Sequence, residues 1–418
     1  MTNAGFRWRT GVVARVVVPA TRWLGFGALT AGLAGLIAFA EPVHQTEALF
    51  PPESWHNHGS SIVEAPNGDL FACWFHGSGE RKADDVRIEA ARRASGSSQW
   101  GPRFTLSDTP GYPDCNPALH VDSTGRLWLF YPTILNNQWE GALLKFRVSS
   151  DWLGQGPPRW ERSEVLHLSP GADFTAALAE TLPELERRAA TNQWSEQTRR
   201  EVHEYLSAAQ THATNLLYRR LGWMPRAHPL AIGDRLVLGV YHDGFSFSLM
   251  AITDDGGTNW QASAPLIGGG NIQPSLVRKR DGTLVAYMRD NGPPPKRLLT
   301  ATSLDRGSTW GPVTDSEIPN PGSGAEVISL RSGAWVFIGN DTEDGRHRLS
   351  VWLSEDEGRT WPWRRALEEG VRGEDSFSYP SLIEAKDGML HATYSVHRPS
   401  GKTIQHAAFN LDWIKATP

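Results

Sequence analysis

One short pattern recurs six times along this chain of 418 residues. It is a turn that ends in glycine, followed after one or two intervening residues by leucine or tryptophan and then by an apolar or alternating run. Such a run after a glycine-ended turn is typical of a β-strand entered through a tight turn. The six copies begin at Gly68, Gly125, Gly233, Gly282, Gly333 and Gly388. Most of the intervals are about 50 to 57 residues, near the blade length of long-repeat propellers. The repeats predict an all-β, six-bladed β-propeller over residues 41–418.

The interval between Gly125 and Gly233 is about twice as long as the others, and residues 171–221 account for the excess. This stretch is rich in Ala, Leu, Glu and Arg, and its apolar residues fall near helical spacing. It predicts a short α-helical insertion of two or three helices, the first interrupted at Pro183. We interpret the insertion as a packing accessory, with a lid over a substrate site as the alternative.

A second repeat follows the pattern S/T-x-D-x-G-x-T-W. It occurs at residues 253–260, with Asn259 in place of the last threonine, and at residues 303–310 and 354–361. In such a turn the Asp and Ser/Thr side chains bind backbone amides, glycine adopts positive φ, and Trp packs between strands. We expect these turns to fold the blades and not to contact substrate.

Composition excludes some classes of function. The net charge of −5 provides no broad basic face, so a nucleic-acid partner is not expected. The 18 tryptophans offer aromatic faces of the kind that cover sugars. Only two cysteines are present, Cys73 and Cys115. They cannot form a disulfide framework, and we expect buried thiols, with a single pairing as the alternative.

The N-terminus has the features of an export signal. A basic segment is followed by an uncharged apolar run over residues 23–40, which ends in Ala38-Phe39-Ala40 before Glu41. This order predicts a signal peptide over residues 1–40 and an exported protein that is periplasmic, cell-surface or secreted. An uncleaved membrane anchor is the alternative, since about 18 apolar residues can span a bilayer.

The three Asp-containing turns resemble the Asp boxes of the sialidase (neuraminidase) superfamily. From about Trp55 onward the chain is similar to the BNR-repeat, sialidase-like proteins. The resemblance implies an exo-glycosidase that hydrolyses a terminal acidic sugar, sialic acid or a related one, from glycans, with no cofactor. Family sialidases bind the substrate carboxylate with three arginines. They use a tyrosine nucleophile paired with a glutamate, and an aspartate as acid/base.

The resemblance assigns catalytic roles to several positions. Tyr379, in the stretch Ser-Tyr-Pro-Ser-Leu, matches the nucleophile, and Asp84 or Asp85, in the loop 77–85, matches the acid/base. Gln273 stands where the family has the glutamate. An amide does not accept the tyrosine proton, and an unassisted phenol of pKa about 10 is a poor nucleophile.

The resemblance also implies a carboxylate-binding site. Arg289 and Arg348 match two of the three arginines, with Arg346 as the less favoured alternative to Arg348. Paired guanidiniums bind a carboxylate in a bidentate manner. His58 is the nearest polar residue where the first arginine is expected.

Further polar stretches are expected to line the same mouth. Their candidate substrate-binding residues are Arg81, Asn291, Arg297, His242 and Asp243. No metal-ligand spacing is present in the sequence.

Two alternatives remain open at this point. A polysaccharide lyase acting on uronic-acid glycans needs no glutamate beside the tyrosine, and His58, His228 and His242 are candidate bases for it. The other alternative to the glycosidase is a propeller that binds an acidic glycan without cleaving it. All three share an acidic glycan or oligosaccharide as partner.

Overall fold

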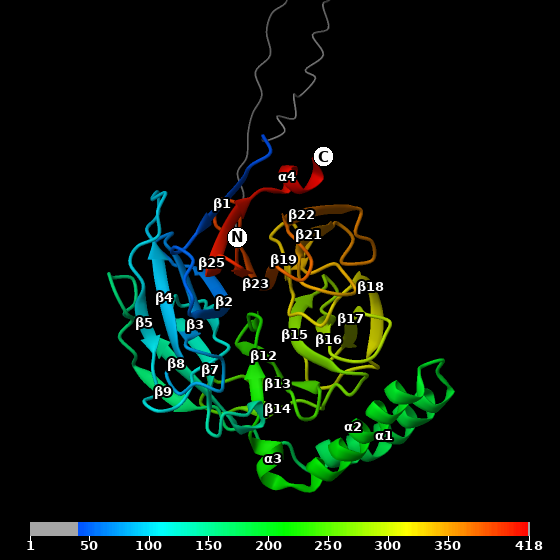
Figure 1. The fold of residues 1–418 in the computed structure, drawn as a ribbon. Helices are drawn as coiled ribbons and strands as arrows, with labels where there is room; N and C mark the ends of the chain where they lie inside the picture. Colours follow the sequence, from blue (N-terminus) through cyan, green and yellow to red (C-terminus); the bar gives the residue numbers. More distant parts are fainter. Residues whose placement is uncertain (1–40, 417–418) are drawn as a thin grey trace, which may run out of the picture. The chain divides into compact units, whose positions relative to one another are not determined.

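The structure, a computed structural model, describes residues 41–416. Its strands form six small antiparallel sheets arranged in a ring (Figure 1), which confirms the six-bladed β-propeller. The expected signal peptide lies outside the described residues. Within residues 41–416, no helix is both long and apolar enough to cross a membrane.

The first three sheets follow one another along the chain. The first contains β2 (His56–Glu64), β3 (Leu70–Gly77), β4 (Arg87–Arg93) and β5 (Phe104–Ser107). The second contains β6 (Ala118–Val121), β7 (Leu127–Ile134), β8 (Ala142–Ser149) and β9 (Arg162–Val165). The third contains β10 (Trp223–Pro225), β11 (Leu230–Ile232), β12 (Arg235–His242), β13 (Phe247–Thr253) and β14 (Gln261–Ala262).

The other three sheets complete the ring. The fourth contains β15 (Asn271–Arg278), β16 (Leu284–Asp290), β17 (Arg297–Ser303) and β18 (Thr314–Pro319). The fifth contains β19 (Glu326–Ser329), β20 (Trp335–Gly339), β21 (Arg348–Ser354) and β22 (Trp363–Glu369). The sixth contains β23 (Ser376–Glu384), β24 (Leu390–Arg398), β25 (Gly401–Phe409) and β1 (His44–Ala48).

Each of the six glycine-ended turns leads into the same strand of its sheet. These strands are β3, β7, β12, β16, β20 and β24. Gly68 and Gly388 illustrate the turn: their φ angles are 86° and 88°, a region that a side chain disfavours. The periodicity in the sequence therefore marks one strand in every blade.

The ring is closed by strands from both ends of the described chain. β1 pairs antiparallel with β25, from His44 opposite Phe409 to Ala48 opposite Gln405. The sixth sheet is thus completed by a strand that precedes all the others in sequence.

The Asp boxes form hairpin turns, as expected, and connect the last two strands of three successive blades, β13 to β14, β17 to β18 and β21 to β22. In the second box, Asp305 accepts hydrogen bonds from the Thr309 amide (2.9 Å) and hydroxyl (2.6 Å), and from the Ser303 hydroxyl (2.8 Å). The Ser303 oxygen in turn accepts from the Gly307 amide, and the Trp310 indole donates to the Gly307 carbonyl. The boxes therefore serve the fold and lie in hairpin connections.

The insertion is helical, as the sequence predicts. It consists of α1 (Ala172–Thr191), α2 (Glu196–Thr214) and α3 (Leu216–Arg220), while a last short helix, α4 (Leu411–Lys415), follows β25. The expected interruption at Pro183 is wrong, because α1 continues through it to Thr191. Leu178 and Leu182 are buried beside the proline, and this packing offsets the one backbone hydrogen bond that proline removes.

The core lies between neighbouring sheets. One large cluster joins the second and third blades to the buried face of the insertion, including Phe174, Leu206 and Trp223. Cys73 and Cys115 are both free and buried, as expected for small apolar side chains.

Candidate active site

Several inner strands carry the same local distortion. Gly59, Gln273 and Tyr379 have φ angles of 62°, 55° and 55°, each at a shift of register in β2, β15 and β23. Asn116, just before β6, has φ of 43°. A bulge of this kind redirects a side chain out of the strand's regular alternation. Asn116, Gln273 and Tyr379 all point their side chains into one cavity.

That cavity has a volume of about 280 Å³ and receives side chains from all six blades, so it lies at the centre of the ring. Its lining residues are His58, Phe75, Glu80, Asn116, Trp139, Tyr241, Asp243, Gln273, Arg289, Asn291, Arg346 and Tyr379. Seven of these residues are named in the analysis of the sequence: His58, Asp243, Gln273, Arg289, Asn291, Tyr379 and, as the less favoured alternative to Arg348, Arg346. The lining does not include Arg81, Asp84, Asp85, His242, Arg297 or Arg348.

The hydroxyl of Tyr379 is surrounded by donors. Nη1 of Arg289 donates to it at 2.9 Å and Nε2 of Gln273 at 3.2 Å. The guanidinium of Arg346 lies 5.4 Å from the centre of the Tyr379 ring. Burial raises the pKa of Tyr379, but the charges of Arg289 and Arg346 and the Gln273 hydrogen bond outweigh it, so the pKa falls below its usual value.

The structure corrects the expected place of one arginine. The carbonyl of Arg346 accepts a hydrogen bond from the Phe377 amide of β23 at 2.8 Å, which brings the Arg346 side chain to Tyr379 two residues further on. Arg348 instead begins β21, and its Nε lies 3.4 Å from a carboxylate oxygen of Asp341. Arg346, and not Arg348, therefore accompanies Arg289 in the cavity.

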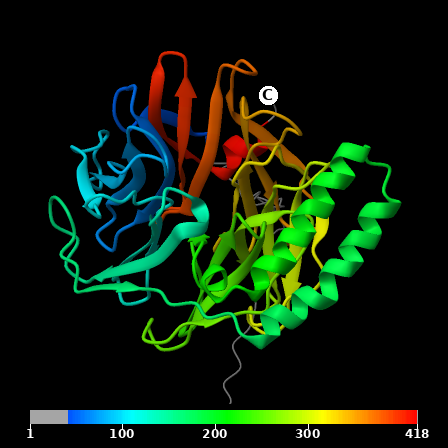
Figure 2. The ribbon, with the colours of Figure 1, turned by 60° about the horizontal axis from the view of Figure 1, so that its bottom comes forward.

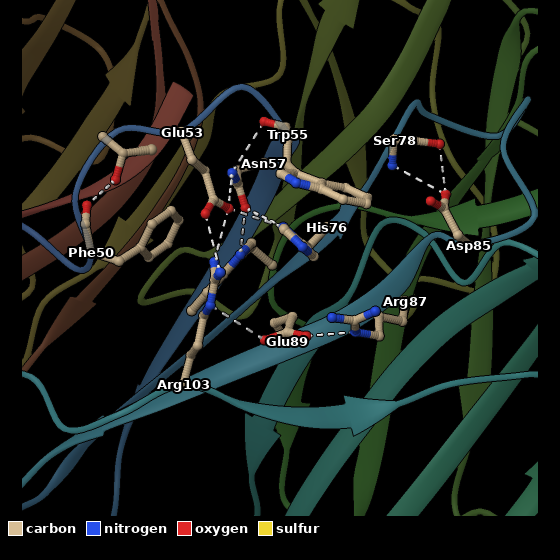
Figure 3. A network of polar contacts seen from close by, with 12 residues as sticks. Phe50, Glu53, Trp55, Asn57, His76, Ser78, Asp85, Arg87, Glu89 and Arg103 are labelled. Atoms are coloured by element: carbon tan, nitrogen blue, oxygen red, sulfur yellow. Dashed lines mark hydrogen bonds and ion pairs between the residues drawn. The ribbon is translucent and has the colours of Figure 1, made fainter. Parts of the chain in front are cut away.

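Asp84 and Asp85 lie outside the cavity. Both side chains are exposed and accept hydrogen bonds from neighbouring residues. Asp85 accepts hydrogen bonds from the amide and hydroxyl of Ser78, and Figure 3 shows its carboxylate turned toward that residue. Asp84 accepts from the side chain of Asn137 at 2.8 Å. The carboxylate that this loop contributes to the cavity is Glu80, which the sequence analysis missed.

A polar network surrounds the start of β2 in the first blade (Figure 3). Arg103 donates to Glu53 at 2.8 Å, and Glu53 also accepts from Asn57 at 3.0 Å. The Asn57 side-chain oxygen contacts His76 at 2.9 Å. These groups satisfy one another and fix the start of β2, the strand that delivers His58 to the cavity.

Asp243 supplies the second carboxylate of the cavity, from the turn between β12 and β13. Its side chain makes no hydrogen bond or ion pair with any residue in 41–416. Burial raises its pKa to about 6, against the opposing charge of Arg289. A carboxyl group with this pKa is protonated in a useful fraction near neutral pH.

His58 packs its ring 4.3 Å from that of Tyr379, and its Nδ1 lies 2.9 Å from the Ser395 hydroxyl. Burial holds its pKa well below the usual value, helped by the charges of His397 and His56. A neutral imidazole therefore packs against the ring of Tyr379.

Arg226 and His228, in a polar stretch that is expected to line the mouth, do not line the cavity and belong to a polar cluster next to Tyr379. Arg226 donates to the carbonyls of Ser60, Tyr379 and Pro380, and its guanidinium lies 5.2 Å from the Tyr379 ring. Its position in the polar stretch Arg-Ala-His gave a signal for a site residue, although not for this role. Arg226 fixes the backbone that carries Tyr379.

His228, a candidate base in the lyase reading, is engaged in the same cluster. Its Nδ1 lies 2.8 Å from a Glu326 oxygen, and its Nε2 lies 2.8 Å from the Ile62 carbonyl. Both ring nitrogens thus face acceptors. The Glu326 charge overcomes the effect of burial and raises the pKa of His228. Among residues 41–416, no group of three or more His, Cys, Asp or Glu side chains is arranged to hold a metal ion.

Comparison with known proteins agrees with this fold. The family described as "BNR repeat-like domain" matches residues 68–183 and 186–392, which is more than half of the chain. A sialidase of Micromonospora viridifaciens is 30% identical over 172 residues, 39% of this chain and 25% of that protein. The match therefore spans about a quarter of that curated relative's length.

Solved structures show the same architecture. A Hadza microbial sialidase matches with a TM-score of 0.63 at 17% identity, over 86% of this chain and 66% of that one. The NanB sialidase of Streptococcus pneumoniae matches with a TM-score of 0.63 at 12% identity, over 88% and 71%. A protein of unknown function from Dyadobacter fermentans matches with a TM-score of 0.63 at 14% identity, over 87% and 97%. At these identities the likeness shows the fold alone.

The fold and the cavity thus define a sialidase-like six-bladed propeller with arginine and tyrosine side chains at its centre. The chain belongs to the family of BNR repeat-like domains within the sialidase superfamily.

Proposed function

We propose that this protein is a glycoside hydrolase that removes a terminal acidic sugar, sialic acid or a related one, from a glycan. One observation carries the proposal. The Tyr379 oxygen receives hydrogen bonds from Arg289 and Gln273 within the central cavity, with Arg346 over its ring. A phenol held in this way is both an activated nucleophile and a neighbour of two cations.

Tyr379 is activated here without a carboxylate partner. Hydrogen-bond donors and positive charges stabilise the phenolate relative to the phenol. The two side chains that contact the Tyr379 hydroxyl, Arg289 and Gln273, both donate hydrogen bonds to it. In the proposed reaction the phenolate attacks the anomeric carbon and forms a covalent bond to it. The bond to the departing sugar oxygen breaks, and that oxygen takes a proton from an acid. Water then hydrolyses the sugar–tyrosine bond.

Arg289 and Arg346 are the proposed carboxylate-binding pair. Nη2 of Arg346 donates to the Gly322 carbonyl at 2.9 Å, and a Cβ built on Gly322 lies 4.0 Å from Nη2 of Arg289. The two guanidiniums thus approach the same residue. A single substrate carboxylate between them gains charge-assisted hydrogen bonds from both.

Asp243 is the proposed proton donor. It faces the cavity without a hydrogen-bond partner among residues 41–416, and burial raises its pKa to about 6. Asp84 and Asp85, at the family's acid position, are exposed and bound to Asn137 and Ser78 instead.

A polysaccharide lyase is a second candidate, favoured by the absence of a carboxylate among the hydrogen-bond partners of the Tyr379 hydroxyl within residues 41–416. Here a uronate carboxylate lies on the arginines, and the phenolate removes the proton next to it. The electron pair forms a carbon–carbon double bond and expels the neighbouring sugar oxygen, which takes up a proton.

Product analysis on purified protein decides between these reactions. A hydrolase releases a saturated acidic sugar from a sialylated oligosaccharide, whereas a lyase releases an unsaturated product that absorbs in the ultraviolet. Tyr379→Phe removes only the hydroxyl and is expected to abolish either activity while sparing binding. Binding of acidic oligosaccharides with no product from either substrate class contradicts both enzymes and leaves a glycan-binding propeller.

We also propose that the protein is exported. The basic segment, the apolar run and Ala38-Phe39-Ala40 support removal of residues 1–40. N-terminal sequencing of protein recovered from the cell envelope or medium tests this, with Glu41 as the expected first residue. An intact Met1 in the membrane fraction favours an anchor instead.

A further inference from the structure

The helical insertion contacts two loops at the mouth of the cavity. Figure 2 shows the two long helices, in green, beside the yellow sheet of the fourth blade. The first loop, residues 243–246, follows His242 at the end of β12, leads into β13 and carries Asp243. The second, residues 291–296, joins β16 to β17 and carries Asn291. Both Asp243 and Asn291 line the cavity.

The first loop is held by two tyrosines of the insertion. The Tyr205 hydroxyl of α2 donates to the Phe245 carbonyl at 2.6 Å. The ring of Tyr218, on α3, lies 4.9 Å from His242 and 5.2 Å from Phe245. A Cβ on Gly244 would come within 1.8 Å of the Tyr218 oxygen, so the loop fits against this side chain without room for any other residue.

The second loop is held by the turn between the two long helices. The Trp194 indole donates to the Pro294 carbonyl at 3.0 Å. The two loops also contact each other, because the side-chain amide of Asn291 donates to the Ser246 hydroxyl at 3.2 Å. Nη2 of Arg289 donates to the Asn291 side-chain oxygen at 3.3 Å. A continuous set of contacts therefore leads from the insertion to the arginine that touches Tyr379.

We propose that the insertion is a brace that holds the cavity-lining side chains Asp243 and Asn291 in place, with Tyr205, Tyr218 and Trp194 as positioning residues. None of the three lines the cavity. The effect on turnover rests on the proposed function, whereas the effect on the loops does not. The brace is a more specific role than the packing accessory that the sequence predicts. It also differs from a lid, since the contacts are made to the loops and no residue of 171–221 lines the cavity.

The test uses variants that each remove a single hydrogen bond between the insertion and a loop. Trp194→Phe removes the indole donor to Pro294 and keeps an aromatic ring, and Tyr205→Phe removes the hydroxyl donor to Phe245. Trp310→Phe is the matched control, because its indole also donates to a backbone carbonyl at 3.0 Å, but in an Asp box. Amide hydrogen exchange is measured across residues 243–246 and at Asn291, Gly292 and Lys296, because the prolines at 293–295 carry no amide hydrogen. Turnover is measured on the acidic substrate.

We expect exchange in these loops to become about 2- to 10-fold faster in Trp194→Phe and Tyr205→Phe, the range that one ordinary hydrogen bond is worth. We expect kcat to fall by a similar factor while KM changes less, and neither effect in Trp310→Phe. If exchange in both loops is the same in Trp194→Phe as in the control, the brace is overturned. A wild-type protein without turnover contradicts the proposed function alone, since the exchange comparison still decides the brace. If Tyr205→Phe does not fold, Trp194→Phe decides.

Discussion

Nη1 of Arg289 lies 2.9 Å from the phenolic oxygen of Tyr379. The guanidinium carries its charge at all accessible pH values, so this contact places a permanent cation against a group that is normally neutral. Arg346 adds a second cation at the ring. The contact with Arg289 links two tasks that a sialidase-like site must perform, binding a carboxylate and generating a nucleophile.

The first prediction concerns the ionisation of Tyr379. Its pKa is lowered by Arg289 and Arg346 against the effect of burial, so the phenolate forms at lower pH than in free tyrosine. Arg289→Gln and Arg346→Gln each raise this pKa, because they remove a stabilising charge. The measurement is the phenolate absorbance of each variant minus that of the same protein carrying Tyr379→Phe.

Arg348→Gln is the control for this titration, since Arg348 lies beside Asp341 and outside the cavity. A shift in Arg348→Gln as large as in Arg346→Gln contradicts the assignment of Arg346 to the site.

The second prediction concerns substrate affinity. Losing one charge-assisted hydrogen bond costs about 1.5–3 kcal/mol, or roughly 10- to 100-fold in Kd. Arg289→Ala and Arg346→Ala are therefore expected to weaken binding of a carboxylated sugar by that factor, and binding of a neutral analogue much less. Calorimetric titration in the Tyr379→Phe background checks this without turnover. Equal losses for charged and neutral sugars argue against a carboxylate clamp.

The third prediction concerns Asp243 and stability. Its pKa is raised to about 6 by burial, so the folded protein binds more protons than the unfolded chain between about pH 4 and 6, and stability falls as pH rises through this window. Asp243→Asn removes that loss. The variant is expected to gain at most about 3 kcal/mol near pH 8 and nothing near pH 4, while losing turnover.

Urea denaturation at both pH values measures this gain. Asp84→Asn serves as the comparison because Asp84 is an exposed carboxylate of a neighbouring loop. If Asp243→Asn is less stable than wild type near pH 8, the carboxylate has a favourable partner in the folded protein and the proposed role as acid loses its physical basis.

The fourth prediction concerns the buried pair below the cavity. Glu326 accepts hydrogen bonds from the His228 side chain and amide and from the Leu382 amide. Breaking a buried ion pair from one side costs about 3–5 kcal/mol. Glu326→Gln is expected to lose that much stability near pH 6, measured by urea denaturation.

The sign of the pH effect follows from the raised pKa of His228. The stabilisation by this histidine is complete below the pKa of the unfolded chain and is lost as pH rises through the pKa of the folded protein. The cost of Glu326→Gln is therefore expected to shrink in alkaline solution. Glu317→Gln, which affects an exposed pair with Arg364, should cost less than about 1 kcal/mol.

Much of the fold could be predicted because its determinants are local. The glycine turns at Gly68 and Gly388, the Asp boxes and the helical spacing of residues 171–221 each depend on a few neighbouring residues. The continuation of α1 through Pro183 could not be predicted, because it depends on apolar packing against the third blade.

The site was harder to predict because side-chain direction depends on where strands begin and bulge. Arg346 and Arg348 are two residues apart, and only the contact of Arg346 with β23 and of Arg348 with Asp341 distinguishes them. A local signal did exist at Gln273 and Tyr379, each followed by Pro-Ser and each with positive φ. It marks the residues that bulges turn toward the cavity.

The pairing of β1 with β25 has a consequence for biosynthesis. Residues 44–48 leave the ribosome early, yet their partner strand ends at Phe409. The sixth sheet therefore cannot form until nearly all of the chain has been made, and until then the first strand has unpaired edges that invite association with other chains. The long separation also makes this a late and slow contact in folding. A truncation that removes β25 would leave every residue lining the cavity in the polypeptide, but β1 would have no partner and the sixth sheet would lose both of its outer strands.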